Sequence, residues 1–483
     1  MALKRDLILV SGGRLVAALI ALVTIRAMTT ILNPEQYGEL VLLIAVQVFC
    51  GLFLINPTGQ YINLHTHAWW DDGTLSARLK PYRQYVMVVA LVGAGLVFGM
   101  SKHYSVEQLF IAATAMAVMV VAGTWNATLI PMLNMLGFRA SSVLWATITT
   151  AIGLASSIFL VLWLHSATAW FAGQAIGLGV GALGARLTLQ GHGLRAKHNQ
   201  SSLPLLNRHT ILAYCLPLAM ATGFMWLQLS GYRFVVESYW GLAQLGFLAV
   251  GLQLAGQLFS LAESLAMQFF YPLFYRRVSA HENLAEVELA FSDLLNTLVP
   301  VYFVLTGLLI LSAPYLLKVL VAPQYQNAIF FVTLGAGIEL CRVLGNLVSN
   351  AAHIKRKTTS LALPYAVGAI TTLGLIYVAG VLQMKVDWAA VALLLGAMVM
   401  LVTMLISMYL QVKFSIDLKR WFGGAAIMLV MTLLAIGTPK AAGLVLAIGI
   451  LIVVTIPAIV AVLLLLWKNP AALRLLNVQL RNN

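Results

Sequence analysis

The sequence predicts an all-α polytopic membrane protein of about fourteen transmembrane helices. We expect two six-helix lobes, related by a pseudo-two-fold axis along the membrane normal, and two further C-terminal helices. Three observations support this: the apolar composition, the succession of long apolar runs and the uneven placement of basic residues. Hydrophobic residues make up 61% of the 483 residues, charged residues only 9%, and the mean hydropathy is +0.92. Soluble globular domains are far less apolar, so the chain belongs in a bilayer.

Long apolar runs fill most of the chain, and they favour helices over strands. Crossing a bilayer core about 30 Å thick takes roughly 20 helical residues, and only helices and closed barrels satisfy their backbone polar groups there. The runs are too long and too continuous for barrel strands, whose side chains alternate between two faces. Fourteen spans are predicted, at 7–32, 37–56, 84–101, 106–135, 140–164, 167–187, 209–232, 241–271, 290–312, 327–352, 358–382, 388–412, 421–437 and 441–467.

Basic residues collect on one side of this succession of spans. If Lys4 and Arg5 lie in the cytoplasm, 21 basic residues lie on that side and five on the other. Positive charge gathers in cytoplasmic loops, and a miscounted span would mix the two groups. The asymmetry therefore supports both the number of spans and the orientation, with the N- and C-termini in the cytoplasm.

Charge, cysteines and histidines exclude several other classes of protein. The net charge of +14 is explained by basic residues that meet anionic membrane lipid, so no nucleic-acid partner is expected. Cys50, Cys215 and Cys341 lie in separate predicted spans, which argues against disulfides. His65 and His67 match no strong metal-ligand spacing, and the two tryptophans beside them predict an interfacial segment. We expect neither a metal nor a cofactor.

A polar turn after the first span is partly repeated halfway along the chain. Arg26 is followed by Asn33-Pro34-Glu35-Gln36-Tyr37-Gly38, and Arg233 is followed by Ala243-Gln244-Leu245-Gly246. Gln and Gly match between the two segments. The partial repeat indicates two copies of one six-helix unit, and because six is even, both copies enter the membrane in the same direction.

A second, weaker match supports the same repeat. Tyr104 and Phe110 before the fourth span correspond to Tyr325 and Phe331 before the tenth. The predicted parts are an N-lobe at 1–190, a cytoplasmic linker at 191–208, a C-lobe at 209–415, and two helices with a cytoplasmic tail at 416–483.

These motifs resemble those of a known transporter family. The arginine of the first span with Asn33-Pro34-Glu35-Gln36-Tyr37-Gly38, its partial repeat, and Tyr325-Gln326-Asn327-Ala328 are similar to the polysaccharide-transporter branch of the multidrug/oligosaccharidyl-lipid/polysaccharide (MOP) exporter superfamily. That branch holds the Wzx-type O-antigen and capsule flippases. The resemblance covers nearly the whole chain as a topology, and it implies two lobes around a central cavity that work by alternating access.

The resemblance also implies a function and partners. The expected substrate is an oligosaccharide repeat unit on undecaprenyl pyrophosphate, moved across the bacterial inner membrane for O-antigen, capsule or exopolysaccharide synthesis. Protons or sodium ions are the expected coupling ions, and polymerase and other membrane proteins of the assembly pathway are the expected partners. In related lipid II flippases two extra C-terminal helices help form a groove for the lipid tail, which suggests the same for the last two spans.

A cavity for such a substrate must replace water around sugar hydroxyls and phosphates. One face of the eighth span carries five polar side chains within about 80° of one another at about 100° per residue. They are Gln253, Gln257, Ser260, Ser264 and Gln268. These side chains either line the cavity or hold neighbouring helices together, as polar residues do in membrane bundles.

Three arginines lie mid-span, where a charge costs about 2.5–3.5 kcal/mol on insertion scales. Arg14 is the best candidate for binding the pyrophosphate. Arg26 lies about 120° further round the helix, so Arg14 and Arg26 cannot project identically into one cavity. Arg26 therefore either binds the substrate from another direction, extends to the outer surface or pairs with Glu39. Arg342 either joins the cavity or neutralises Glu339, three residues before it.

Two intramembrane carboxylates, Glu263 and Glu339, are the candidates for ion coupling. Glu263 has no partner nearby in sequence, so it is either a proton site or the partner of Arg14 or Arg26 in space. The sequence does not separate these alternatives.

Two other functions remain as alternatives. A drug or cation antiporter of the same superfamily has an acidic binding site, whereas the mid-span arginines here outnumber the two glutamates and favour an anionic substrate. A membrane polysaccharide polymerase or ligase needs a long external loop for catalysis, and no predicted outer loop reaches twenty residues. We therefore expect a transporter rather than an enzyme.

Overall fold

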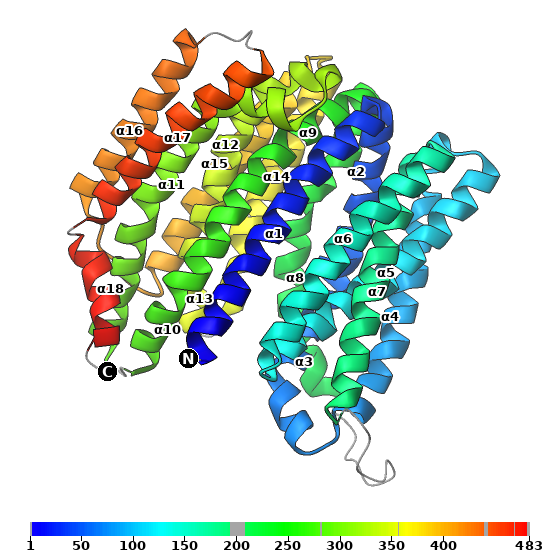
Figure 1. Cartoon of the computed structure of the whole chain (residues 1–483), viewed down its shortest axis with the longest axis horizontal. Coiled ribbons are helices and arrows are strands. Elements are labelled where there is room, and N and C mark those ends of the chain that lie inside the picture. Colours follow the sequence, from blue (N-terminus) through cyan, green and yellow to red (C-terminus); the bar gives the residue numbers. More distant parts are fainter. Residues whose placement is uncertain are drawn as a thin grey trace. The chain divides into compact units, whose positions relative to one another are not determined.

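The computed structural model describes residues 2–193, 208–280, 283–355, 357–438, 443–467 and 469–480, and every regular element within them is a helix (Figure 1). Contacts divide the chain into two compact units, Met1–Phe234 and Val235–Asn483. Each of the fourteen predicted spans overlaps one or more of the described helices. By length and composition, eleven helical segments of the described residues are able to cross a membrane, and several of these join consecutive helices, the longest over 71 residues. The prediction of an all-α polytopic fold is confirmed.

The first unit consists of helices that run back and forth in sequence order. Its elements are α1 (Ala2–Ile31), α2 (Pro34–Phe49), the π-helix η1 (Cys50–Ile55), α3 (Asn56–Asp71), α4 (Leu75–Phe98), η2 (Ser101–His103), α5 (Val106–Met135), α6 (Arg139–Leu164), α7 (Ala167–Gly191), α8 (Arg208–Trp226), the π-helix η4 (Leu227–Gly231) and the start of α9 (Tyr232–Phe269). α8 packs on α3 and η1 within this unit. The predicted linker 191–208 lies mostly outside the described residues, and the predicted lobe boundaries stay a prediction.

The polar turn after the first span is a helix start. The Asn33 side chain accepts a hydrogen bond from the Gln36 backbone at 2.8 Å, and the Gln36 side chain accepts one from the Asn33 backbone at 3.1 Å. Pro34 occupies the first turn of α2, where its missing N–H costs nothing. Gln36 also donates to the carbonyl of His165, between α6 and α7, at 2.8 Å. The motif therefore begins α2 and ties it to the α6–α7 turn.

Small residues allow α6 and α7 to pack closely. Gly173, Gly177 and Gly181 follow one another at intervals of four along α7. A Cβ atom on any of them would collide with the α6 backbone at Ser157 and Gly153 or with the Thr149 hydroxyl. Close approach of backbones at small residues is the usual way in which helices associate in lipid, where no hydrophobic drive exists between them.

The segment expected at the membrane interface is part of a longer helix. α3 continues η1 as far as Asp71, and the chain turns at residues 72–74 before α4 begins. Within α3, the His65 ring packs 4.4 Å from the ring of Tyr61 and 5.3 Å from that of Trp69. Trp69 is only 8% exposed. Trp69 therefore packs inside the first unit, whereas Trp70 is partly exposed, and the interfacial position of this segment stays a prediction.

The second unit is built around the long helix α11. Its elements are the rest of α9, α10 (Tyr271–Ala280), α11 (Leu284–Leu320), η5 (Pro323–Ala328), α12 (Ile329–Val348), α13 (Asn350–Ile354), η6 (Thr358–Leu361), α14 (Ala362–Val381), α15 (Asp387–Tyr409), α16 (Leu418–Gly437), α17 (Leu444–Leu466) and α18 (Pro470–Leu480). α11 packs against α12, α16, α17 and α18 (Figure 1). Gly241, with φ of 80° and ψ of 172°, breaks α9 into two helical parts in a conformation that is essentially restricted to glycine.

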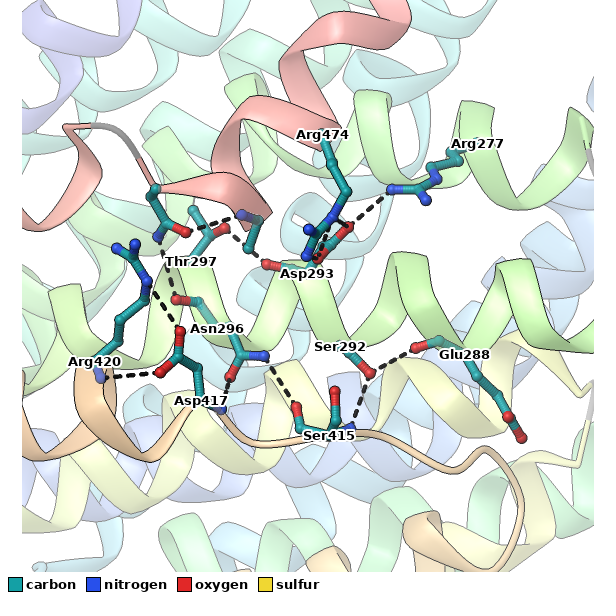
Figure 2. Close-up of polar contacts among 12 residues, drawn as sticks. Arg277, Glu288, Ser292, Asp293, Asn296, Thr297, Ser415, Asp417, Arg420 and Arg474 are labelled. Carbon is teal, nitrogen blue, oxygen red and sulfur yellow. Dashed lines mark hydrogen bonds and ion pairs between the residues drawn. The ribbon is translucent and has the colours of Figure 1, made fainter.

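A buried carboxylate joins the C-terminal elements to α11 (Figure 2). Asp293 has no exposed surface and accepts hydrogen bonds from Arg277 Nη1 and from Arg474 Nε, both at 2.9 Å. Arg277 belongs to α10 and Arg474 to α18. The hydrogen bonds from Arg474 to Asp293 raise the pKa of Arg474 above its usual value, so this contact remains ionic.

One turn further along α11, Asn296 binds the segment that leads into α16. Its carbonyl oxygen Oδ1 accepts from the Asp417 backbone at 2.9 Å and from Trp421 Nε1 at 3.0 Å. Its Nδ2 donates to the carbonyl of Ser415 at 2.9 Å. Three segments far apart in sequence thus meet on one face of α11, at Asp293 and Asn296.

Asp293→Asn should destabilise the second unit by about 1.5–3 kcal/mol, because the buried guanidinium of Arg277 then keeps only the partly exposed Glu286 and Arg474 loses its carboxylate partner. Thermal unfolding of the detergent-solubilised protein measures the loss. The control is Asp417→Asn, which removes the half-exposed ion pair to Arg420 but keeps a side chain able to cap α16, and should cost at most about 1 kcal/mol. Equal unfolding temperatures for Asp293→Asn and the unmodified protein would contradict this role.

Candidate functional site

A polar cavity of about 420 Å³ lies within the first unit, between the α2–η1–α3 helix, α4 and α5. Neutral hydrogen-bonding side chains line it, and none of its lining residues is charged. The polar members are Gln47, Asn56, Gln60, Asn63, Tyr82, Thr124 and Thr128. Gly51, Gly59 and Gly123 also border the cavity and widen it by their lack of side chains. We refer to this cavity as the amide pocket.

The π-helix η1 gives the amide pocket its shape. Gln47 and Asn56 are nine residues apart, which at about 100° per residue would place them on opposite sides of an ideal α-helix. In η1 the Asn56 N–H bonds to the carbonyl of Gly51, five residues back, so the turn holds an extra residue. That residue rotates the following helix by about 100° and brings Asn56, and with it Gln60 and Asn63, to the side of Gln47.

Several amides of the pocket have free hydrogen-bonding capacity. Gln47 and Asn63 form no side-chain hydrogen bond with any described residue, and Gln60 donates only a long bond of 3.4 Å to Asn56. The opposite wall is held by hydrogen bonds among its own residues, because Thr128 donates to the carbonyl of Thr124 at 2.7 Å and its hydroxyl lies 3.4 Å from the Tyr82 hydroxyl. One wall of the pocket is thus held in place, and the other carries amides that both donate and accept hydrogen bonds.

A charged triad lies inside the membrane-spanning part of the second unit. Arg342 on α12 donates from Nε to Glu339 and from Nη2 to Glu263 on α9, each at 2.7 Å. Asn346 donates to the other oxygen of Glu263 at 3.0 Å. The three charged side chains retain 15–20% of their exposure, so they are only partly sealed from their surroundings. Two carboxylates share one guanidinium, which leaves the triad with one negative charge when all three groups are ionised.

Close packing of α9 on α12 positions the triad. A Cβ atom on Gly335 would lie 3.0 Å from that of Ala255, and one on Gly256 would lie 3.5 Å from the Glu339 carboxylate. Asn350, the first residue of α13, accepts from the Tyr275 hydroxyl at 2.7 Å. Arg342 and Asn346 of α12 and Asn350 of α13 follow at intervals of four, so polar side chains continue from the triad to α10.

The triad bears on two of the alternatives that the sequence left open. Glu263 has a partner within the second unit, Arg342, which lies 79 residues further along the chain and was not considered as its partner from the sequence. The role of Glu263 in ion coupling stays a prediction. Arg342 pairs with Glu339, as expected, and with Glu263 in addition.

The other predicted site residues lie apart from the triad or outside the described side chains. The polar row of α9 is half-buried at Gln253, Gln257, Ser264 and Gln268 and exposed at Ser260, so the row is not enclosed in the core of the second unit. Its role in a cavity stays a prediction.

The two arginines of α1 are described to different extents. The Arg14 side chain lies outside the described residues, and its proposed contact with pyrophosphate stays a prediction. Arg26 is exposed near the end of α1. Glu39, one of the partners considered for Arg26, accepts a hydrogen bond from Thr168 at 3.4 Å.

The amide pocket was not predicted from the sequence. Its members are spread over α2, α3, α4 and α5, and no periodicity in the sequence signals the π-helix that aligns them. The only local signal was a run of amides at Asn56, Gln60 and Asn63, next to Gly51 and Gly59 in an otherwise apolar region.

Solved transporter structures share this fold, whereas no protein-family model and no curated protein matches the chain. The lipid II flippase MurJ in an inward closed conformation aligns with a TM-score of 0.68 at 12% identity, over 95% of this chain and 98% of MurJ. An inward-facing multidrug resistance MATE family transporter of the MOP superfamily aligns with 0.57 at 12%, over 86% and 95%.

A third structure is a MOP superfamily transporter from Pyrococcus furiosus, described as having a binding pocket of reverse polarity. It aligns with a TM-score of 0.53 at 11% identity, over 84% of this chain and 94% of its own. Together these likenesses show that the chain has the fold of these MOP superfamily structures.

Removing Arg342 should leave two carboxylates without their cation in the membrane interior. Arg342→Met alone is expected to destabilise the protein by about 3–5 kcal/mol, whereas Arg342→Met combined with Glu263→Gln and Glu339→Gln should recover most of that loss. Unfolding of the solubilised variants by heat, followed through intrinsic fluorescence, measures both effects. A triple variant no more stable than Arg342→Met would contradict the pairing.

Proposed function

We propose that this protein is a flippase that moves an undecaprenyl-pyrophosphate-linked oligosaccharide repeat unit across the bacterial inner membrane. It would act by alternating access and supply the synthesis of O-antigen, capsule or exopolysaccharide. The amide pocket is the observation that carries the proposal, because it is an uncharged cavity of hydrogen-bonding groups in a chain with a MOP-type transporter fold. MurJ, one of the solved structures with this fold, is a lipid II flippase.

Sugars need the chemistry that the amide pocket offers. Each hydroxyl both donates and accepts a hydrogen bond, and losing these bonds on entering an apolar medium costs several kcal/mol. Gln47, Asn56, Gln60 and Asn63 carry amides with both functions, on a helix whose π-turn aims them at one space. The volume of about 420 Å³ suits one or two sugar rings rather than a whole repeat unit.

Pyrophosphate needs cations, and Arg14 and Arg26 on α1 are our candidates for them. Export of an anionic head group is also driven by an inside-negative potential, which supplies about 2.3 kcal/mol per charge per 100 mV. We place both termini in the cytoplasm, and we assign α16 and α17 to a groove for the lipid tail. Both helices expose most of their apolar side chains and pack mainly on α11.

The triad is our candidate for ion coupling. Its two carboxylates, Glu263 and Glu339, share Arg342 and carry one negative charge in excess, which a proton or a sodium ion would neutralise. If either carboxylate were neutralised, the Arg342 guanidinium would pair with the other carboxylate alone. Such a switch between two pairings on α9 and α12 would link ion binding to helix movement.

A drug or cation antiporter is the second candidate, and two observations favour it. MATE transporters share the fold, and the excess negative charge of the triad would attract a cationic drug. The amide pocket argues against it, since cationic drugs are usually bound by acidic and aromatic groups rather than by amides alone. A polysaccharide polymerase or ligase has no observation in its favour.

The flippase proposal predicts a specific transport activity. Purified protein in proteoliposomes should translocate an undecaprenyl-pyrophosphate-linked oligosaccharide, measured by protection of the sugar from an external glycosidase or lectin. Gln47→Ala with Asn63→Ala should lower the rate about tenfold or more, since each lost hydrogen bond to a sugar is worth about 1 kcal/mol. The control, Asn283→Ala, removes only a helix cap far along the chain and should preserve transport.

Two results would overturn the proposal. One is ethidium efflux without any movement of the lipid-linked sugar, which would favour the antiporter. The other is unchanged transport by the Gln47 and Asn63 variant, which would separate the amide pocket from the substrate.

Ion coupling has its own test. Collapsing the proton and sodium gradients should slow transport by the unmodified protein, and Glu263→Gln should transport at a rate that no longer responds to either gradient. The amide retains a hydrogen-bonding partner for Asn346, so the packing of α9 is expected to survive. Transport that is insensitive to both gradients in the unmodified protein would remove the triad from the mechanism.

A further inference from the structure

A second cavity of the first unit has opposite chemistry at its two ends. It is a groove of about 790 Å³ between α4, α5 and α7. One end carries Lys80 and Arg83 from α4 with Arg186 from α7, and no acidic residue is among its lining residues. The other end is apolar and lined by Met87, Ala90 and Leu91 of α4 with Ala117, Val118 and Val121 of α5. We call this cavity the cationic groove.

Helix directions explain this separation of charge. α4 begins at the cationic end, whereas α5 and α7 run the other way and bring Trp125, Arg186 and Gln190 to that same end. From Lys80 to Leu91 the helix rises by about 16 Å, close to half of a hydrocarbon core about 30 Å thick. The groove therefore spans about one leaflet, with its basic end at the face where the charge asymmetry predicts the cytoplasm.

The three basic side chains have no counter-ion in the described part of the chain. Lys80, Arg83 and Arg186 are exposed, and none of them forms an ion pair with a described residue. Met87, Leu91 and Leu183 at the rims are more than half exposed. Three cations at one end of an apolar groove are complementary to a molecule with an anionic head and a hydrocarbon tail.

α5 separates the cationic groove from the amide pocket. Its residues Val120, Thr124 and Thr128 face the pocket, whereas Val121 and Trp125 face the groove. The Trp125 ring meets the Tyr82 ring edge to face at 5.7 Å, which fills the wall between the two cavities. An occupant of the groove would therefore contact the same helix as an occupant of the pocket, from the other side.

We propose that the cationic groove binds one anionic glycerophospholipid of the inner leaflet, with its phosphate on Lys80, Arg83 and Arg186 and an acyl chain along α4 and α5. Basic pockets between transmembrane helices at the cytoplasmic side are suited to anionic head groups, and each basic residue contributes about fivefold to the affinity. The bound lipid would brace α4 and α7 against α5, the helix that carries one wall of the amide pocket.

Trp125 provides a probe for this site. The protein is reconstituted in phosphatidylcholine vesicles that contain a small fraction of either brominated phosphatidylglycerol or brominated phosphatidylcholine, whose bromine atoms quench nearby tryptophans. We expect stronger quenching by the anionic lipid, and we expect Trp125→Phe to abolish that excess. Replacing Lys80, Arg83 and Arg186 together by Gln should lower the preference for the anionic lipid about one hundredfold.

A matched variant controls for net charge. Lys357, Lys413 and Lys419 are exposed basic residues of the second unit on the same predicted side, and their joint replacement by Gln should leave the preference unchanged. Equal quenching by the two brominated lipids, or an excess that survives the triple groove variant, would overturn the proposal. Displacement of brominated phosphatidylglycerol by undecaprenyl phosphate at lower mole fractions than by phosphatidylglycerol would assign the groove to the substrate instead. The measurement involves no transport, so its outcome is independent of the flippase proposal.

Discussion

A polar or charged group inside a bilayer has no water to bind, and this constraint governs the structure described here. Backbone groups meet it by forming helices throughout the described residues. Side chains meet it in two ways. Asp293 is completely buried and is shared by two arginines, whereas Glu263 and Glu339 share one. Where the amides of the first unit have no protein partner, the fold leaves a cavity beside them.

The Asp293 cluster and the Arg342 triad differ in how rigidly they hold the helices that they join. The Asp293 cluster is balanced in charge, since Arg277 and Arg474 meet Asp293 and Arg277 also pairs with Glu286. It is closed off at the Asp293 carboxylate and ties α10, α11 and α18 together, so it is suited to hold a fixed arrangement. The triad has an excess of carboxylate and remains partly exposed. Binding a small cation at the triad changes its charge balance at little cost, and this is why we assign coupling to it and a structural role to Asp293.

In the first unit, one helix lines two cavities of different chemistry. α5 is apolar towards the cationic groove and presents threonines and glycine towards the amide pocket. A cavity of hydrogen-bonding groups and a cavity for an amphipathic molecule thus share a single wall. Packing in this unit relies on glycines along α7, which allow α6 to approach closely.

The sequence by itself determined that the chain belongs in a bilayer and that its spans are helices, and it offered pairing with Glu339 as one of two roles for Arg342. Long apolar runs, charge asymmetry and a three-residue helical spacing are local or summed properties that need no coordinates. Only the tertiary structure decided that Glu263 meets Arg342, that Asp293 gathers the C-terminal helices, and that Gln47 faces the same space as Asn56. The first two depend on contacts between helices distant in sequence. The third depends on a π-turn, whose extra residue shifts the register of a helix without leaving a pattern in composition or period.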